Sequence, residues 1–230
     1  DLIFGLPGQN LARWKYSLKN ALSLNPTHIS LYALTVEEQT PFHRWYQRGL
    51  METIDDDMAA DQYELASEML EQTGYSQYEI SNWSIPGMEC LHNLQYWRMK
   101  PYLGLGAGAH GYDCGKRMAN VSWIGAYIKR MEEREVLEFP FSPANESRIL
   151  LEVADEMNEF MMVGLRLVNE GVSEREFTER FGKTLVEVFG KPLEKLEKRN
   201  LIERKPEDRD RIRLTKQGRL LGNQVFLEFV

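Results

Sequence analysis

The opening of the chain, DLIFGLPG, constrains the fold more than any other segment. Residues 2–4 are apolar and are followed at once by Gly5, Pro7 and Gly8, a pattern typical of a buried strand that ends in a loop. A buried parallel strand needs neighbours, and a strand that opens a chain leaves one edge exposed unless another segment covers it. We therefore expect this sequence to begin inside a larger domain.

Hydrophobic periodicity over the first half predicts helices that alternate with short strands. The helices are expected at residues 10–24, between Pro41 and Gly49, and at 55–72, and the strands at 1–4, 28–34, 78–81 and 102–105. The acidic residues 55–57 favour a helix N-terminus, and Gly74 favours the end of that helix. Strands separated by helices are typical of parallel βαβ units rather than of a sandwich.

The second half has a different pattern. Helices are expected at residues 147–166, 173–182 and 190–199, followed by two β segments at 201–204 and 212–214. Three helices followed by a two-stranded ribbon form the outline of a winged-helix module. The prediction is an α/β chain in three parts: residues 1–115, a connecting segment 116–146 with a helix near 122–135, and a winged-helix-like α+β domain over 147–230.

Composition narrows the class of protein. The chain is 43% hydrophobic and 27% charged, which is typical of a soluble globular protein with a core. The net charge of −7 argues against a protein built mainly to hold a polyanion. No run approaches the roughly 18 apolar residues of a membrane helix, and no secretory signal is visible. Cys90 and Cys114 are the two cysteines, which is too few for a disulfide framework, so we expect a cytoplasmic protein without a transmembrane segment.

The winged-helix outline raises nucleic-acid binding as a rival function. Residues 151–230 carry 15 Lys and Arg against 16 Asp and Glu, so this half is not basic. A module that reads DNA usually has a basic recognition helix, whereas the helix expected at 190–199 mixes lysines with Glu194 and Glu197. The ribbon that follows is more basic. We expect no nucleic-acid partner, and a winged-helix regulator is the least favoured function.

The glycine-rich run GLGAGAHG at residues 104–111 resembles a dinucleotide fingerprint only superficially. A dinucleotide turn opens a helix, whereas this run continues through residues 110–113 into turn residues. It offers a strand end without bulky side chains, against which a flat ligand can lie. The alternative is a tightly packed strand crossing. Asp1 with its glycine loop has the same two interpretations: a ligand pocket or a plain strand and turn.

The segment CLHNLQYW at residues 90–97 is the third candidate. His92 can ligate a metal, including haem iron, and Tyr96 and Trp97 offer flat apolar surface. In a helix, His92 and Tyr96 stand at positions i and i+4 and share a face. A zinc site needs three or four ligands, and Cys90 with His92 supplies two. The alternative is a structural histidine among aromatic residues.

Five segments taken together carry a resemblance that none carries alone. They are DLIFGLPGQ at 1–9, HISLYALT at 28–35, YEISN at 78–82, PGxECxHNxxYW at 86–97 and YxGxGAGAHG at 102–111. In this order they resemble HemW-like proteins, the haem-chaperone branch of the radical-SAM family of oxygen-independent coproporphyrinogen III oxidases. The resemblance is strong up to about residue 112 and looser in the tail. It implies the C-terminal part of an open radical-SAM (βα) barrel followed by a helical C-terminal domain.

The resemblance also implies a site for S-adenosyl-L-methionine (SAM). The matching positions are Asp1, Ala33, Gly106, Ala107, Gly108 and His110. His110 stands where the oxidases have an aliphatic residue, so its contact is expected through the backbone. The family holds its [4Fe–4S] cluster with three closely spaced cysteines, a spacing that Cys90 and Cys114 lack. The cluster ligands are therefore expected upstream, and the chain alone is expected to be inactive.

The H-N-x-x-Y-W pattern resembles the signature of the haem chaperones, which the oxidases do not share. It implies haem contacts from His92, Asn93, Tyr96 and Trp97, with His92 as the candidate iron ligand. Whether His92 ligates iron or orders the pocket stays open. The implied function is the capture of haem and its transfer to an acceptor haem protein, with SAM and the cluster in support. The alternative is the oxidative decarboxylation of coproporphyrinogen III propionates by an oxidoreductase.

Overall fold

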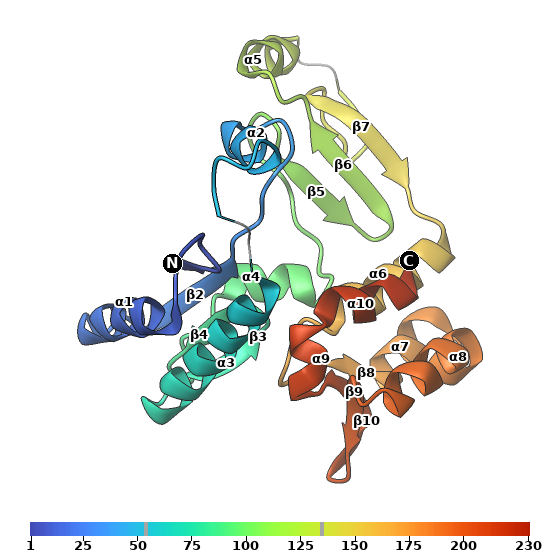
Figure 1. The fold of residues 1–230 in the computed structure, drawn as a ribbon. Helices are drawn as coiled ribbons and strands as arrows, with labels where there is room; N and C mark the ends of the chain where they lie inside the picture. The colour runs from blue at the N-terminus through green and yellow to red at the C-terminus, as the bar shows by residue number, and fades with distance from the viewer. Residues whose placement is uncertain (53–54, 134–135) are drawn as a thin grey trace. The chain divides into compact units, whose positions relative to one another are not determined.

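The computed structural model describes residues 1–52, 55–133 and 136–230. It consists of two compact units, Asp1–Cys90 and Leu91–Val230 (Figure 1). The domain boundaries predicted near residues 115 and 146 stay a prediction.

The sheet of the first unit has the strand order β1-β2-β4-β3. β1 (Leu2–Phe4) pairs in parallel with β2 (His28–Ala33), and α1 (Leu11–Ser23) connects them. β3 (Ser76–Glu79) and β4 (Asn82–Ser84) form an antiparallel hairpin, and β4 also runs antiparallel to β2. Among the described strands, the expectation of parallel units therefore holds for the pair β1 and β2 alone.

The strand predicted at 78–81 is present as β3 but is displaced by two residues, because the chain turns at residues 80–81. The carboxylate of Glu79 accepts hydrogen bonds from the backbone N–H of Ser81, at 3.1 Å, and from the side chain of Asn82. These local bonds stabilise a tight turn at residues 80–81 and end β3 at Glu79. The apolar pattern alone does not distinguish a continuous strand from a two-stranded hairpin here; the bonds of Glu79 favour the hairpin.

The helices of the first unit pack on its sheet through apolar faces. α1 begins after the N-cap Asn10 and buries Trp14 and Leu18. α3 (Asp56–Gln72) begins after the N-cap Asp55, whose side chain accepts a hydrogen bond from Met58 N at 3.0 Å. These faces join Phe4, Ile29, Leu31, Ala66, Leu70, Tyr75 and Trp83 in one core. A short helix, α2 (Pro41–Gln47), lies between β2 and α3, so all three predicted helices are confirmed.

The second unit begins with α4 (Leu91–Trp97) and an antiparallel sheet of strand order β5-β6-β7. Its strands are β5 (His110–Asp113), β6 (Lys116–Asn120) and β7 (Asn145–Leu150). α5 (Ile124–Glu132) confirms the helix predicted near 122–135, of which residues 134 and 135 lie outside the described residues.

Two predictions in this region are wrong. The strand expected at 102–105 is reduced to a single bridge between Tyr102 and Tyr112. The side-chain amide of Asn120 donates to the carbonyls of Gly104 and Gly106, at 3.1 and 2.9 Å, and so satisfies backbone groups that a ladder would otherwise pair. The helix expected from residue 147 begins only at Val153, because residues up to Leu150 pair with β6. Tertiary strand pairing here overrides the helical pattern.

The C-terminal part continues with α6 (Val153–Gly164), β8 (Val172–Ser173), α7 (Glu174–Phe181), α8 (Leu185–Lys198), β9 (Ile202–Lys205) and β10 (Asp208–Leu214). The strands form an antiparallel sheet of order β8-β10-β9. α9 (Lys216–Leu220), α10 (Gly222–Phe226) and a short 3-10 helix (Leu227–Phe229) follow. The three helices and two β segments are confirmed, and β8 adds a strand that two residues are too few to predict.

The predicted start of the third helix at Gly190 is wrong, because α8 begins at Leu185 after a capping box between Thr184 and Glu187. The helix continues past Gly190 and Pro192 with non-helical backbone angles at Phe189, φ −119° and ψ 19°. Proline lacks an N–H and clashes with the carbonyl four residues earlier, which bends a helix without ending it. Gly190 and Pro192 therefore mark a kink within α8 and not the start of a helix.

Candidate functional site

α4 presents the histidine of the H-N-x-x-Y-W segment at the surface. His92 is exposed, and its Nε2 lies 2.9 Å from the hydroxyl of Tyr96, one helical turn later. The two rings meet edge to face with their centroids 4.8 Å apart. The predicted i, i+4 arrangement of His92 and Tyr96 is therefore present, while Leu94 on the other side of the helix is buried.

Tyr96 is supported in turn by Tyr102, whose ring centroid lies 4.5 Å away at 88°. Burial raises the pKa of Tyr102, and the nearby Arg117 guanidinium opposes that rise. Arg117 forms an ion pair with Glu159 at 2.7 Å. Burial also raises the pKa of Glu159, against the same guanidinium. The exposed imidazole thus stands at the end of a row of aromatic and charged side chains that leads to α6.

Trp97 lies apart from this row. The guanidinium carbon of Arg166 lies 4.7 Å from the centre of the Trp97 ring and 5.1 Å from that of Phe226. One face of Trp97 is therefore covered by a cation, and the ring is half-buried. Asn93 is half-buried on the same helix. Of the four residues that the motif suggests for haem, His92 and Tyr96 stand together, and Trp97 stacks instead against Arg166.

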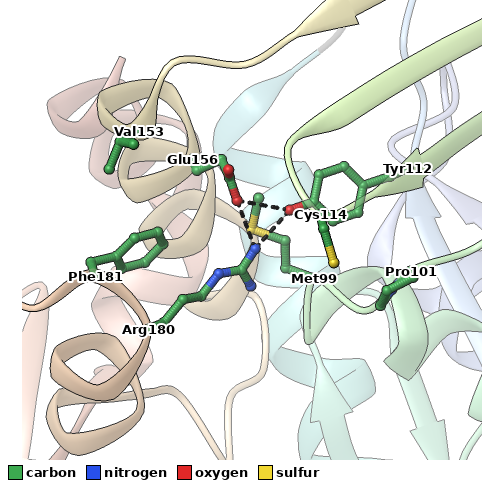
Figure 2. A pocket seen from close by; sticks show the side chains of 8 residues that line it. All are labelled: Met99, Pro101, Tyr112, Cys114, Val153, Glu156, Arg180 and Phe181. Carbon is green, nitrogen blue, oxygen red and sulfur yellow. Dashed lines mark hydrogen bonds and ion pairs between the residues drawn. The ribbon is translucent and has the colours of Figure 1, made fainter.

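A cavity of about 450 Å³ lies elsewhere in the second unit (Figure 2). The Arg180 guanidinium donates to the hydroxyl of Tyr112 at 2.7 Å and to Glu156 at 2.8 Å, and the Tyr112 hydroxyl donates to Glu156 at 3.0 Å. Burial raises the pKa of Tyr112. Met99, Pro101, Cys114, Val153 and Phe181 complete the lining. Sequence reasoning missed this cluster, since its members come from separate elements and form no local motif.

Asp1 and Ala33, which the resemblance assigns to SAM, occupy the parallel pair of the first unit. Phe4 pairs with Ala33, so Ala33 stands at the carboxyl end of β2, whereas Asp1 precedes Leu2 at the amino end of β1. Three residues of strand, about 10 Å, separate their levels. A ligand that contacts both residues must therefore span this distance along the strands.

The loop after β1 is held by a residue that the sequence did not single out. Gln62 of α3 is fully buried; its side chain accepts from Gly5 N and donates to the carbonyl of Gln9, both at 2.7 Å. A cavity of about 410 Å³ adjoins this loop and is lined by Gly5, Leu6, Gly8, Gln9, Asn10, Glu52, Asp55 and Met58. A lone glutamine on an amphipathic helix carries no sequence signal for such a role.

Gly106, Ala107, Gly108 and His110 lie in the second unit. Gly106 and Gly108 have φ of +104° and +72°, and Gly106 N donates to the hydroxyl of Tyr127 at 3.2 Å. A Cβ on Gly104 would lie 2.2 Å from the carbonyl oxygen of His110, whereas one on Gly106 would meet open space. Of the two interpretations of this glycine run, tight packing therefore applies at Gly104, and backbone open to a ligand applies at Gly106. His110 is exposed and pairs with Ala119 through its backbone.

Neither cysteine has a sulfur partner: Cys90 is half-buried and Cys114 is exposed, and both are free. Within residues 1–52, 55–133 and 136–230, no group of three or more His, Cys, Asp or Glu side chains is placed to hold a metal ion. Across the same residues, the helices are all too short or too polar to cross a membrane.

Comparison with known proteins shows which sequences and structures this chain is similar to. Over all 230 residues the chain is 39% identical to the heme chaperone HemW of Bacillus subtilis, of which it covers 58%. It is 35% identical to the heme chaperone HemW of Lactococcus lactis, of which it covers 57%. The chain is a homologue of the HemW haem chaperones. It spans a little more than half the length of these two relatives.

Two further matches agree with HemW homology. The model of the HemN C-terminal domain matches residues 151–221, a range that contains α6, α9 and all the elements between them. The solved structure of coproporphyrinogen III oxidase (HemN) from Escherichia coli, a radical SAM enzyme, superposes with a TM-score of 0.75 at 19% identity. It covers all of this chain and 54% of the oxidase, and at that identity it establishes a shared mixed α/β fold.

Proposed function

We propose that the protein containing this chain is a haem chaperone of the radical-SAM class, which binds haem and transfers it to an acceptor haem protein. The observation that carries the proposal is the exposed imidazole of His92 on α4, within a chain that is homologous to HemW over its full length. The oxidase alternative rests on fold alone, because the identity to the solved oxidase is 19%. We place the protein in the cytoplasm, with no nucleic-acid partner.

His92 suits the role of a haem ligand for three reasons. Neutral imidazole is a common axial ligand of haem iron. The side chain is exposed, so a planar molecule can approach it. Leu91, at 77% exposure, offers apolar surface beside it. Tyr96 already contacts Nε2, so ligation through that nitrogen requires the hydrogen bond to be broken.

Trp97 fits haem contact less well than the motif suggests. Arg166 covers one face of its ring, which leaves no stacking surface on that side. We therefore assign cargo contact to His92, with Tyr96 and Asn93 as neighbours, and assign Trp97 to the support of α4.

SAM and a [4Fe–4S] cluster belong to the proposal as supporting cofactors, with the cluster ligands outside this chain. When bound, a reduced cluster supplies the electron that cleaves SAM. The open backbone at Gly106 and the carboxyl end of β2 at Ala33 are suited to close approach by a ligand. The residues proposed for SAM are Asp1, Ala33, Gly106, Ala107, Gly108 and His110. On this proposal residues 1–115 belong to a radical-SAM barrel, residues 116–146 form the connecting segment, and residues 147–230 form a winged-helix-like domain.

Haem titration of the full-length protein tests this function. Wild-type protein should develop a Soret band and saturate at a defined stoichiometry, and His92→Ala should shift the band and weaken binding. His43→Ala in α2 is the matched control and should titrate like wild type. Anaerobic turnover with coproporphyrinogen III should yield no protoporphyrinogen. Unchanged haem binding in His92→Ala would remove His92 from the proposal, and turnover would favour the oxidase.

A further inference from the structure

We propose that the loop between α6 and β8 (residues 165–171, the α6–β8 loop) positions His92 for haem by anchoring the C-terminal end of α4. The inference rests on the proposed haem-binding function. It assigns positioning roles to Arg166 and Glu170, neither of which belongs to the motif that points to haem.

The first anchor is the stack on Trp97, the last residue of α4. Arg166 from the α6–β8 loop lies 4.7 Å from the Trp97 ring centre and 5.1 Å from that of Phe226 in α10. A guanidinium between two aromatic faces is attracted to both ring quadrupoles. Trp97, Arg98, Leu167 and Glu170 all adjoin one cavity of only about 40 Å³, so the helix end and the loop are closely packed.

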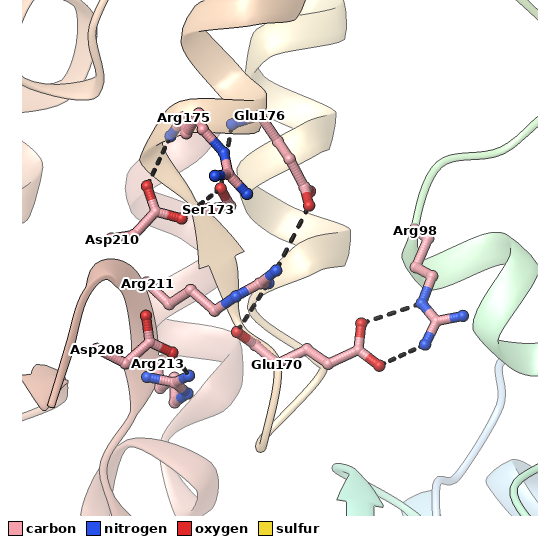
Figure 3. A network of polar contacts seen from close by, with 9 residues as sticks. All are labelled: Arg98, Glu170, Ser173, Arg175, Glu176, Asp208, Asp210, Arg211 and Arg213. Carbon is pink, nitrogen blue, oxygen red and sulfur yellow. Dashed lines mark hydrogen bonds and ion pairs between the residues drawn. The ribbon is translucent and has the colours of Figure 1, made fainter.

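The second anchor is an ion pair one residue later. Arg98 donates from Nε to one carboxylate oxygen of Glu170 at 3.0 Å and from Nη2 to the other (Figure 3). Two parallel bonds between a guanidinium and a carboxylate restrict orientation as well as distance. Consecutive residues at the end of α4 are thus held by two residues of the same loop.

The α6–β8 loop is itself firmly held. Leu165, Leu167 and Val168 are each at most 3% exposed. Arg211 of β10 donates to the Glu170 carbonyl at 3.3 Å and to the Glu176 carboxylate at 3.4 Å (Figure 3). Arg213, also in β10, donates to the Asn169 carbonyl at 2.5 Å. The loop therefore links β10 to the C-terminal end of α4 through these contacts.

The geometry of α4 makes this anchoring matter at His92. The helix has seven residues, and His92 precedes Trp97 by five, about 7.5 Å along the axis. In so short a helix, the contacts at its C-terminal end set the direction of the axis. Release of that end displaces His92 relative to Tyr102, against which the His92–Tyr96 pair rests.

The test compares haem dissociation constants of full-length variants that circular dichroism shows to be folded. Arg166→Gln should weaken haem binding by up to about 30-fold, the upper range for a cation held on aromatic faces. Glu170→Arg should weaken it by about two- to fivefold, the range for a partly exposed ion pair. Arg98→Glu combined with Glu170→Arg should recover most of the loss. The reversed pair Glu194→Lys with Lys198→Glu on α8 is the matched control, since that exposed salt bridge lies away from α4.

The Soret maximum at saturation separates positioning from ligation. Arg166→Gln and Glu170→Arg should reach the wild-type maximum at higher haem concentration, because His92 remains the ligand, whereas His92→Ala should not reach it. Wild-type dissociation constants in both single variants, or no recovery in the reversed Arg98–Glu170 pair, would overturn the inference. Absence of haem binding in wild type would instead overturn the proposed function itself.

Discussion

The hydroxyl of Tyr96 lies 2.9 Å from Nε2 of His92, and this contact occupies one of the two ring nitrogens through which an imidazole binds iron. The exposed histidine is therefore already partnered, and haem that binds through Nε2 must displace the tyrosine hydroxyl. On the proposed function, this hydrogen bond opposes haem binding and favours haem release.

Tyr96→Phe should tighten haem binding by about two- to tenfold, because a net hydrogen bond of about 0.5–1.5 kcal/mol no longer competes with iron. The ring and its edge contact with Tyr102 are retained. Soret titration measures the change, and Tyr16→Phe, at an exposed ring in α1, is the control. Weaker binding in Tyr96→Phe would mean that the hydroxyl supports the bound state instead.

Gly218→Ala should destabilise the second unit by more than about 2 kcal/mol, the scale of forced overpacking. A Cβ at this position would lie 1.9 Å from the carbonyl oxygen of Leu201. Gly190→Ala is the matched control, since its nearest neighbour would be Val186 Cγ1 at 3.7 Å and alanine favours a helix. Thermal unfolding measures both, and equal midpoints for the two variants would contradict the close approach at Gly218.

The free energy of unfolding of Glu159→Gln should increase relative to that of wild type as pH rises. Burial raises the pKa of Glu159 above its usual 4.5, despite the opposing Arg117 guanidinium. A carboxyl with a raised folded pKa contributes stability below pH 4.5 and loses it as pH rises through the folded value. Glutamine does not titrate and so avoids that loss. Urea unfolding at pH 4 and pH 7 gives the free energy of unfolding of Glu159→Gln minus that of wild type. A difference that falls between pH 4 and pH 7 would refute the prediction.

Gln62→Leu should destabilise the first unit by about 2–5 kcal/mol, because the buried N–H of Gly5 and carbonyl of Gln9 both lose their partner. Glu64→Leu, on the exposed side of the same helix, is the control. Urea unfolding monitored by tryptophan fluorescence measures the difference, since Trp14 donates its indole N–H to the Gln62 carbonyl. Similar midpoints for the two variants would show that the bridge is dispensable.

The sequence predicts the helices of the first unit well because their signals are local. Asn10 and Asp55 cap α1 and α3. Buried residues follow one another at intervals of four, Trp14 and Leu18 in α1 and Ala66 and Leu70 in α3. The β5-β6-β7 sheet escaped prediction, since its strands are short and partly polar and depend on pairing with distant residues such as Asn145 and Leu150. Register of that kind has no local signature.

The candidate site divides in the same way. His92 and Tyr96 are four residues apart on one helix, so their contact follows from helical geometry. Arg166 reaches Trp97 from the α6–β8 loop, and Glu170 lies 72 residues from Arg98. The motif names residues from the whole of α4 together. The fold separates His92 and Tyr96, which we propose for haem contact, from Trp97, which stacks against Arg166.

The contacts of the α6–β8 loop also bear on genetics. Gly171 has φ of +61°, and a Cβ there would lie 2.1 Å from the Ile212 carbonyl oxygen, so the loop tolerates no other residue at that corner. We expect a selection for defective haem delivery to return alleles at Gly171, Arg211 and Arg213 alongside His92. Such alleles would map to the α6–β8 loop and to β10, away from the haem-binding motif in the sequence, and their haem affinity would distinguish them from general folding defects.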